Sequence, residues 1–432
     1  MHETGGVAAP ENRSVKHGWQ TKVGHDFNGA DRVARGETRM DGSKALELAD
    51  LEAVGPGTPA GRYLRLFWQP VMRLKDLPPG RAKPLEILGE MFTVYRAEDG
   101  TPHVTAYRCP HRGTPLSLGW VEGESLRCRY HGWRYDGTGQ CVEQPNEDRP
   151  FCERIHLRSY PTRDYAGLIF AYLGDGKPPP FPRYPDMDRP GVIVTDPVEI
   201  LPCSYWNRFD NDHCHIPWVH RATALRTGRN DLLVIRHERV EETEYGWRGH
   251  RSIKGEEPGS ETGLGKAKLT HWFMPNVRLF FAPCRAKGFQ GRDLWDTKMV
   301  WTVPVNDTSH AAFDVTHTPV EGEEARAFAA ARAEQEEEHD TRWDLAEKIL
   351  AGEMTLEDLP ADMTAYTSFT IEDYCTQVGQ GPIRGRGKEN LAPTDARLVL
   401  MRRLWLREVG ALTSDRELTN WKIPTEPLSA GN

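Results

Sequence analysis

Four residues of the N-terminal half have the types and the spacing of a metal site. Cys109 and His111 form a Cys-x-His pair, and sixteen residues separate it from the Cys-x-x-His pair of Cys128 and His131. Thiolate sulfur and imidazole nitrogen are ligands that transition metals prefer over most other protein groups. The spacing therefore predicts a bound metal.

The same four residues would also suit a structural zinc site, because Cys2His2 is a zinc ligand set. Classical zinc fingers, however, place both cysteines before both histidines. Here each pair mixes Cys with His, and both pairs lie in segments marked by Gly and Pro. Mixed pairs are typical of a Rieske [2Fe–2S] centre, in which two histidines replace two cysteines on one iron. We therefore expect a Rieske cluster rather than zinc.

A second group of candidate ligands lies in the sequence NRFDNDHCHIPWVH, the densest His/Asp cluster in the second half of the chain. On an ideal helix, His213 and His220 would share one face, whereas His215 and His220 would lie apart. Pro217 removes a backbone donor between them and disrupts regular winding, which would bring His215 and His220 together. Asp212 is close to His215 in either case. These residues alone leave both registers open.

The elements that must position these groups change in character near residue 180. Upstream, short apolar-alternating runs predict strands, with a hairpin turning at Asp99-Gly100 and a further strand in AGLIFAYLGD. A Pro-rich connector, GKPPPFPRYPDMDRPG, follows. Beyond 190 longer runs suit an antiparallel sheet: GWRGHRSIKG, KLTHWFMPNVRLFFAP, TKMVWTVPVND and HAAFDVTHTPV. Helices are predicted over 323–350 and in DARLVLMRRLWLREV, with Thr394 as its N-cap.

These elements predict an α+β fold in three parts. An N-terminal arm is expected over 1–60, an all-β Rieske [2Fe–2S] domain over 61–180, and a catalytic domain over 181–432 with a central antiparallel sheet and flanking helices. The Glu-rich EQEEEHD of the first predicted helix is interpreted as a solvated face rather than a metal site.

Composition excludes several classes of protein. The net charge of −8 argues against a nucleic-acid or anionic-membrane surface, and no apolar run approaches the length of a membrane span. The first thirty residues lack the features of a signal peptide, and eight cysteines in 432 residues are too sparse for a secreted disulfide scaffold. We expect a cytoplasmic protein that binds neither nucleic acid nor membrane.

The segment CPHRGTPLSLG…LRCRYHGWRYDGTGQC resembles the Rieske domain of the Rieske non-haem iron ring-hydroxylating oxygenases. GPGTPAGRYLRLFWQPV and GQGPIRGRGKENLAPTDARLVLMRRL are similar to the phthalate-dioxygenase-like branch of their alpha (terminal oxygenase) subunits. The resemblance implies a helix-grip-like catalytic domain, a mononuclear non-haem Fe(II) and O2 as co-substrate. It also implies a homotrimer, and NAD(P)H acting through a separate flavin- and iron–sulfur-containing reductase, with or without a ferredoxin.

The resemblance also selects ligands for the mononuclear iron. The family pattern Asp-x-x-His-x4-His matches Asp212, His215 and His220, and implies that Asp212 bridges the iron ligand His215 to the Rieske ligand His131 of a neighbouring subunit. The family tends to place Asn where this chain has Phe209. The Asn-x-x-Asp-x-x-His spacing occurs instead in another register, at Asn207, Asp210 and His213.

The third ligand implied by the resemblance is a carboxylate from SFTIEDYCTQVGQGPI, where Asp373 matches the family position and Glu372 is the nearest competitor. The implied reaction is mono- or cis-dihydroxylation of a small aromatic substrate, with an aromatic acid as the leading hypothesis. O- or N-demethylation is the alternative, and a non-catalytic Rieske electron carrier is the rival from another class. Arg208 is a candidate to bind a substrate carboxylate, and the candidate pocket residues are His271, Trp272, Phe273 and Phe281.

Overall fold

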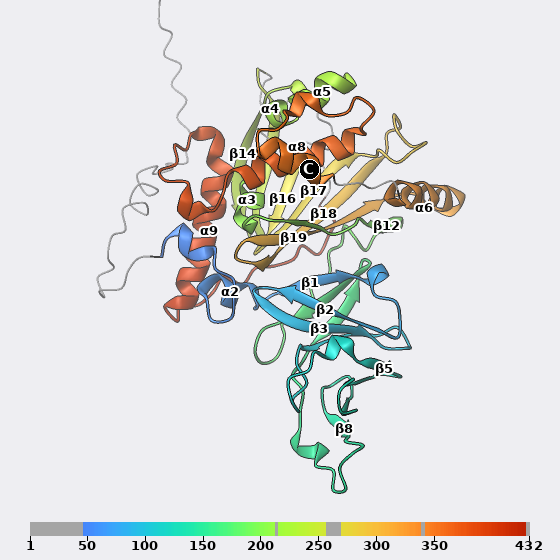
Figure 1. Ribbon diagram of the computed structural model, residues 1–432. Helices are drawn as coiled ribbons and strands as arrows, with labels where there is room; N and C mark the ends of the chain where they lie inside the picture. Colours follow the sequence, from blue (N-terminus) through green and yellow to red (C-terminus); the bar gives the residue numbers. More distant parts are fainter. Residues whose placement is uncertain (1–45, 212–214, 256–268, 338–341, 429–432) are drawn as a thin grey trace, which may run out of the picture. The chain divides into compact units, whose positions relative to one another are not determined.

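The computed structural model describes residues 46–211, 215–255, 269–337 and 342–428 (Figure 1). The chain divides into two units, Met1–Glu47 and Leu48–Asn432, and the fold described here is that of the second. It consists of three small sheets followed by one large sheet with helices, which confirms the predicted α+β fold. None of the described helices is long and apolar enough to cross a bilayer.

The part that carries the two Cys/His pairs is built from two four-stranded antiparallel sheets. The hairpin predicted at Asp99-Gly100 is confirmed: Gly100 has φ +95°, and the Asp99 carboxylate accepts a hydrogen bond from the backbone N–H of Thr101. The strands of the first sheet are β2 (Arg81–Ile87), β3 (Glu90–Arg96), β4 (Pro102–Ala106) and β9 (Ser159–Tyr160). Those of the second are β5 (Trp120–Glu122), β6 (Ser125–Arg127), β7 (Arg134–Tyr135) and β8 (Cys141–Glu143).

A three-stranded sheet completes this part of the chain. The strand predicted in AGLIFAYLGD is β11 (Leu168–Tyr172), whose five residues are all buried. It lies between β1 (Trp68–Arg73) and β10 (Thr162–Tyr165), antiparallel to both. The predicted Pro-rich connector follows, since neither helix nor strand lies between β11 and the next strand.

The second part is organised by an eight-stranded antiparallel sheet with the order β12-β19-β18-β17-β16-β15-β14, to which β13 adds by pairing with β19. All four predicted strand segments belong to it, and one of them contains two strands. The strands are β12 (Val192–Thr195), β13 (Glu199–Leu201), β14 (Arg236–Thr243), β15 (Gly246–Ile253), β16 (Leu269–Phe273), β17 (Val277–Pro283), β18 (Trp295–Asn306) and β19 (Ser309–Thr318).

One face of this sheet, called here the Rieske-side face, packs on the first part of the chain. On β17 it carries the buried side chains of Leu279 and Phe281. Trp301 of β18 makes an edge contact with Phe170 of β11 at 5.6 Å between ring centroids, and Tyr184 of the connector contacts Trp301 at 5.7 Å. Apolar side chains at every second position therefore join the two domains.

The opposite face, called the helix-side face, is covered by helices (Figure 1). Phe209 of α3 packs on Trp272 of β16 at 4.8 Å, and Trp405 of α9, which is fully buried, contacts Phe209 and Trp206. The helices of the described chain as a whole are α2 (Pro59–Leu64), α3 (Tyr205–Asp210), α4 (Ile216–Val219), α5 (Arg221–Thr227), α6 (Gly322–Glu337), α7 (Trp343–Leu350), α8 (Ala365–Gly379) and α9 (Ala396–Thr413).

Three local predictions differ from the structure. The helix predicted over 323–350 is two helices, α6 and α7, and Arg342 between them has φ +48°, outside the helical region. The N-cap of α9 is Asp395 rather than Thr394, because a short 3-10 turn precedes the helix. Part of the predicted arm is ordered, since Leu51 is fully buried and its carbonyl accepts a hydrogen bond from the Tyr205 hydroxyl at 2.6 Å.

The aromatic cluster formed by Trp405, Trp206 and Phe209 should dominate the stability of the catalytic domain. We expect Trp405→Ala to lower the free energy of unfolding by about 3–5 kcal/mol, because it removes a large side chain from a closed aromatic core. Urea denaturation followed by circular dichroism measures this. Trp218→Ala is the matched control, since Trp218 is 63% exposed. Equal losses in the two variants would contradict the assignment of Trp405 to the core.

Candidate metal centres

The two Cys/His pairs lie in two loops that have the same backbone hydrogen bonds. In the first loop, the N–H of Cys109 donates to the carbonyl of Thr114, and Gly113 N–H donates to the carbonyl of Cys109. In the second, Cys128 N–H donates to Trp133, and Gly132 N–H donates to Cys128. Gly113 and Gly132 have φ +79° and +73°, which glycine adopts without strain. The repeated geometry presents the two pairs as matched halves of one site.

Within this site the two thiols lie next to each other, and so do the two imidazoles. The thiols of Cys109 and Cys128, 3% and 2% exposed, are close enough to share a hydrogen bond, which lowers the pKa of Cys128 to about 6. The imidazoles of His111 and His131 lie 4.4 Å apart between ring centroids and are only half-buried. Two adjacent sulfurs and two adjacent imidazoles suit two irons, one with each kind of ligand.

The site fits a two-iron cluster better than a single zinc ion. A tetrahedral ion needs all its ligand atoms close together, yet no three of these residues form such a group, although the described part of the chain contains one elsewhere. The Nδ1 atom of His111 is buried and has no hydrogen-bond partner in the structure, so its lone pair is free for a metal.

Neighbouring side chains support the same site. Tyr135 lies 3.1 Å from the Cys109 sulfur, and burial raises the pKa of Tyr135 far above its usual value, so its hydroxyl stays protonated and donates to a thiolate. Trp133 stacks on the ring of His111 at 4.3 Å and fixes its orientation.

A second group of ligand atoms converges in the catalytic domain. His215, His220 and Asp373 each offer one atom, and these atoms all lie within 4.8 Å of one another. His220 Nε2 is 3.8 Å from Asp373 Oδ1, which also accepts a hydrogen bond from the Asn211 side chain at 3.3 Å. Two imidazoles and one carboxylate form the ligand set of a non-haem iron site with open positions.

The backbone around Pro217 brings the two histidines together. His215 immediately precedes α4, and Pro217 lies in the first turn, where its missing N–H is tolerated. His220 stands at the junction of α4 and α5 with φ −93° and ψ 20°, so the helix is interrupted there. This interruption, rather than a kink at Pro217, changes the angle between the two histidine side chains around the helix axis. The imidazole rings of His215 and His220 therefore lie 6.0 Å apart between centroids.

Glu372, the competitor of Asp373, points to the other side of His220. Its carboxylate is fully buried and lies 2.8 Å from His220 Nδ1, and it accepts hydrogen bonds from the backbone and side chain of Thr223 at 3.0 and 2.9 Å. A carboxylate that accepts from one ring nitrogen fixes the tautomer and turns the other nitrogen to a metal. Glu372 therefore positions His220, and Asp373 faces its free nitrogen.

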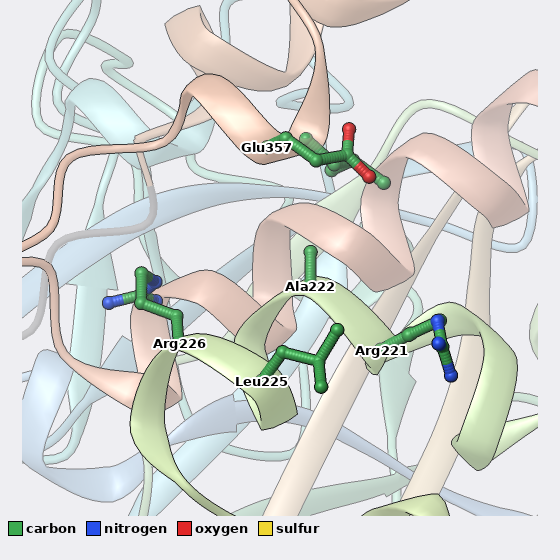
Figure 2. A pocket seen from close by; sticks show the side chains of 6 residues that line it. Arg221, Ala222, Leu225, Arg226 and Glu357 are labelled. Atoms are coloured by element: carbon green, nitrogen blue, oxygen red, sulfur yellow. The ribbon is translucent and has the colours of Figure 1, made fainter.

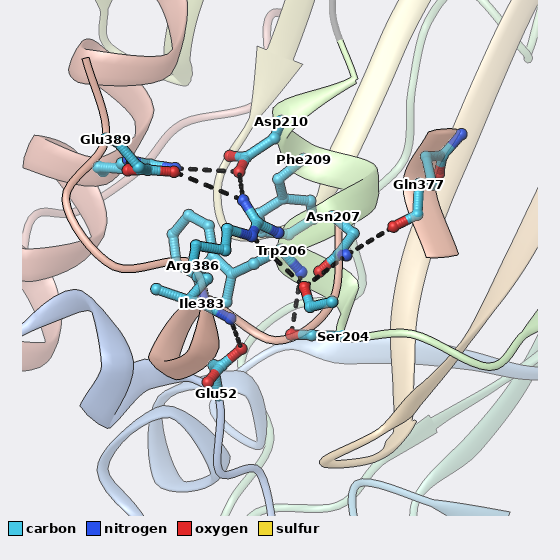
Figure 3. Close-up of polar contacts among 12 residues, drawn as sticks. Glu52, Ser204, Trp206, Asn207, Phe209, Asp210, Gln377, Ile383, Arg386 and Glu389 are labelled. Atoms are coloured by element: carbon cyan, nitrogen blue, oxygen red, sulfur yellow. Dashed lines mark hydrogen bonds and ion pairs between the residues drawn. The ribbon is translucent and has the colours of Figure 1, made fainter. Parts of the chain in front are cut away.

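The alternative register is occupied by structural contacts (Figure 3). Asn207 donates its side-chain N–H groups to the carbonyls of Gln377 and Gly381, at the end of α8. Asp210, 7% exposed, pairs with the buried guanidinium groups of Arg386 and Arg402 at 2.8 and 3.0 Å. Both residues therefore contribute to the packing of α3 against the C-terminal segments. Asp212 and His213 lie outside the described residues.

Three of the four candidate pocket residues lie on the face of the sheet opposite the helices that carry the His/Asp group. His271, Phe273 and Phe281 lie on the Rieske-side face, where Tyr184 contacts Phe273 at 5.3 Å and Tyr245 hydrogen-bonds to His271. Trp272 is on the helix-side face but is buried under Phe209. Sequence aromaticity selected these residues, whereas strand alternation, set by pairing, decides which side chains can approach the iron ligands.

A hollow of 190 Å³ lies beside α5 (Figure 2). It is lined by Arg221, Ala222, Leu225, Arg226, Leu356 and Glu357. None of these residues belongs to the His/Asp group, although Arg221 directly follows His220 in the chain.

The two loop glycines offer a test of the first site. A Cβ on Gly113 would meet no atom within 4 Å, whereas one on Gly132 would come within 2.8 Å of the Pro145 ring. Gly113→Ala should cost only backbone strain of about 1–2 kcal/mol, while Gly132→Ala also displaces the loop that holds Cys128 and His131. We expect a greater loss of cluster absorbance in Gly132→Ala. Equal cluster content would contradict the described loop packing.

Adjacent acids on α8 offer a test of the second site. Asp373→Ala should lose the mononuclear iron, and Glu372→Gln should retain it with about 10–100-fold weaker affinity, since it loses only the orienting contact. Both variants should keep the cluster spectrum. Iron per chain after anaerobic reconstitution measures the difference, with the exposed Asp362→Asn as control. Iron binding that survives Asp373→Ala but not Glu372→Gln would reverse the two roles.

Comparison with known proteins identifies the family. Residues 67–161 match the model of the Rieske [2Fe-2S] domain. The oxygenase subunit of 5,5'-dehydrodivanillate O-demethylase from a Sphingobium species is 27% identical over 84% of this chain and 80% of its own length. The phthalate 4,5-dioxygenase oxygenase subunit of Pseudomonas putida is 26% identical over 82% of this chain and 83% of its own.

The fold is also that of a solved oxygenase. The terminal oxygenase of carbazole 1,9a-dioxygenase from Nocardioides aromaticivorans IC177 superposes with a TM-score of 0.60 at 20% identity, covering 84% of this chain and 96% of that one. The predicted cofactors, a Rieske cluster and a non-haem iron that uses O2, follow from these relationships. This chain belongs to the Rieske non-haem iron oxygenases, as an alpha (terminal oxygenase) subunit.

Proposed function

We propose that this subunit hydroxylates a small aromatic acid at an Fe(II) held by His215, His220 and Asp373. The observation that carries the proposal is the convergence of these three side chains beside the buried Glu372, in a chain that also has a Rieske domain. Two imidazoles and a carboxylate leave positions open at the iron, where O2 and the substrate can be brought together.

In this proposal the residues of the chain provide geometry. Glu372 holds the Nδ1 proton of His220, and Asn211 holds one oxygen of Asp373, so both ligands are oriented before a metal binds. Preorganised ligands spend little free energy on rearrangement. Cys109, His111, Cys128 and His131 would hold the cluster, whose reduction potential is raised by neutral imidazoles and by the Tyr135 hydrogen bond.

The path of electrons is part of the proposal. The partly exposed His131 is a suitable exit from the cluster, since both cysteine ligands are buried. Asp212 would accept hydrogen bonds from His131 of one subunit and His215 of the next, within a homotrimer. Electrons would come from NAD(P)H through a flavin- and iron–sulfur-containing reductase, with or without a ferredoxin. A cytoplasmic setting suits the seven described cysteines, which are all free.

Demethylation is a second candidate function, and one observation favours it. A relative that matches 84% of this chain is named as an O-demethylase. Hydroxylation of a methyl group next to oxygen gives an unstable hemiacetal that releases formaldehyde, so the same iron site would serve both reactions. The two functions differ only in which carbon of the substrate faces the iron.

The test is oxygen uptake coupled to product formation. The holoprotein, supplied with a surrogate reductase and NADH, should consume O2 with aromatic acids and give hydroxylated products, and with methoxy-substituted acids the release of formaldehyde would report demethylation. His215→Ala should abolish turnover, a loss of at least about 100-fold, while the cluster is still reduced. If the wild-type holoprotein carries only cluster iron and oxidises no compound, it is an electron carrier instead.

A further inference from the structure

The helix-side face of the large sheet carries charged residues at positions that strand pairing aligns. Arg278 of β17 pairs with Val300 of β18, and Val300 pairs with Asp314 of β19. Lys298 pairs with Phe280, two residues beyond Arg278. Directly paired residues share a face of the sheet. These side chains therefore lie on the face opposite Leu279 and Phe281, under the helices that carry the iron ligands.

Arg278 differs from its charged neighbours because it lacks an acid partner. Lys298 lies 3.9 Å from Asp314 and is paired with it. The guanidinium of Arg278 lies over the ring of Phe280, 4.8 Å from its centroid, and forms no hydrogen bond or ion pair with any residue that the structure describes. Burial lowers the pKa of Arg278 to about 9, yet the side chain is not completely covered. It is enclosed by the fold but accessible.

A second arginine stands nearby. Arg208 of α3 is half-buried, and its guanidinium is likewise without a hydrogen-bond or ion-pair partner in the described part of the chain. Its positive charge disfavours the charged form of Arg278, whereas Asp314 and Asp373 favour it. Two enclosed guanidinium groups that repel each other are a costly arrangement, and a bound anion relieves that cost.

The surrounding charges leave room for such an anion. The cations Arg208, Arg278, Lys298 and Arg397 are balanced by the carboxylates of Asp196, Glu199, Asp314 and Asp373, whose charges act on the same group of side chains. A divalent metal held by Asp373 would leave the helix-side face with an excess of positive charge.

We propose that Arg278, together with Arg208, binds the carboxylate of the substrate and thereby selects an aromatic acid and sets its distance from the iron ligands. This inference rests on the proposed function, and it names the substrate class and the residues that recognise it. A planar guanidinium binds a carboxylate through two parallel hydrogen bonds, which a neutral amide or ester cannot match. The Phe280 ring beneath Arg278 supports the guanidinium plane.

Binding and turnover are tested on the same compounds. The probes are benzoate, 4-methoxybenzoate and 3-hydroxybenzoate, each matched with its primary amide, and the holoprotein is titrated calorimetrically without reductase. Wild-type protein should bind at least one acid more tightly than its amide by about 10–100-fold, the size of a hydrogen bond to a charged group. Arg278→Met should remove this preference, and Arg278→Lys should restore only part of it.

Two further variants keep the test decisive. Arg208→Met should also reduce the preference for the acid, and it replaces Arg278→Met if that variant loses its cluster spectrum or fails to fold. Arg248→Met on β15 is the matched control, since this strand arginine is paired with Glu241. It should leave the ratio of acid to amide affinity unchanged.

The outcomes separate this inference from the proposed function. Acid binding that depends on Arg278 without any oxygen-coupled product supports the inference and overturns the oxygenation of these acids. Turnover of neutral aromatic compounds, with acid affinity unaffected by Arg278→Met and Arg208→Met, overturns the inference and leaves the oxygenase intact. In the supported case, the loss in turnover should appear mainly in KM for the acid, whereas a merely structural role would lower cluster content and kcat together.

Discussion

The buried carboxylate of Glu372 is the interaction on which the candidate iron site depends. It joins α8 to the junction of α4 and α5, since its two oxygens contact His220 and Thr223. A fully buried acid is tolerated only when its oxygens are satisfied, and here they are. The same contacts decide which nitrogen of His220 faces Asp373. A site assembled from residues 152 positions apart in sequence is thus held by one charged group that need not touch the metal.

The large sheet divides the work of the catalytic domain between its faces. Trp301 contacts Phe170 of the Rieske domain and shares its face with the buried Leu279 and Phe281, while Arg278 and Lys298, on the same two strands, lie on the face under the helices. The period of two in a strand makes this division possible. One domain contact and one polar surface are therefore built from a single set of backbone hydrogen bonds.

The sequence predicted best what depends on local chemistry. The Cys/His pairs, the hairpin at Asp99-Gly100 and the long strands follow from spacing and alternation, and the structure has them in place. The choice of Asp373 over Glu372 required resemblance to a family, because adjacent acids on one helix point in different directions and only tertiary packing shows which one meets His220. Arg278 was missed altogether. The signal was a charged residue inside the apolar strand VRLFFAP, where an arginine without a local partner is unusual.

The alternation along β17 also bears on how such an enzyme changes its substrate over evolutionary time. Because Arg278 and Phe280 project away from the residues that join the domains, they can be replaced while the docking of the Rieske domain stays as it is. Substitutions on one face of this strand can then change substrate selectivity, while the other face keeps the contact that electron delivery requires. A directed-evolution library confined to even-numbered positions of this strand would explore new ligands at little risk to the assembly of the redox machinery.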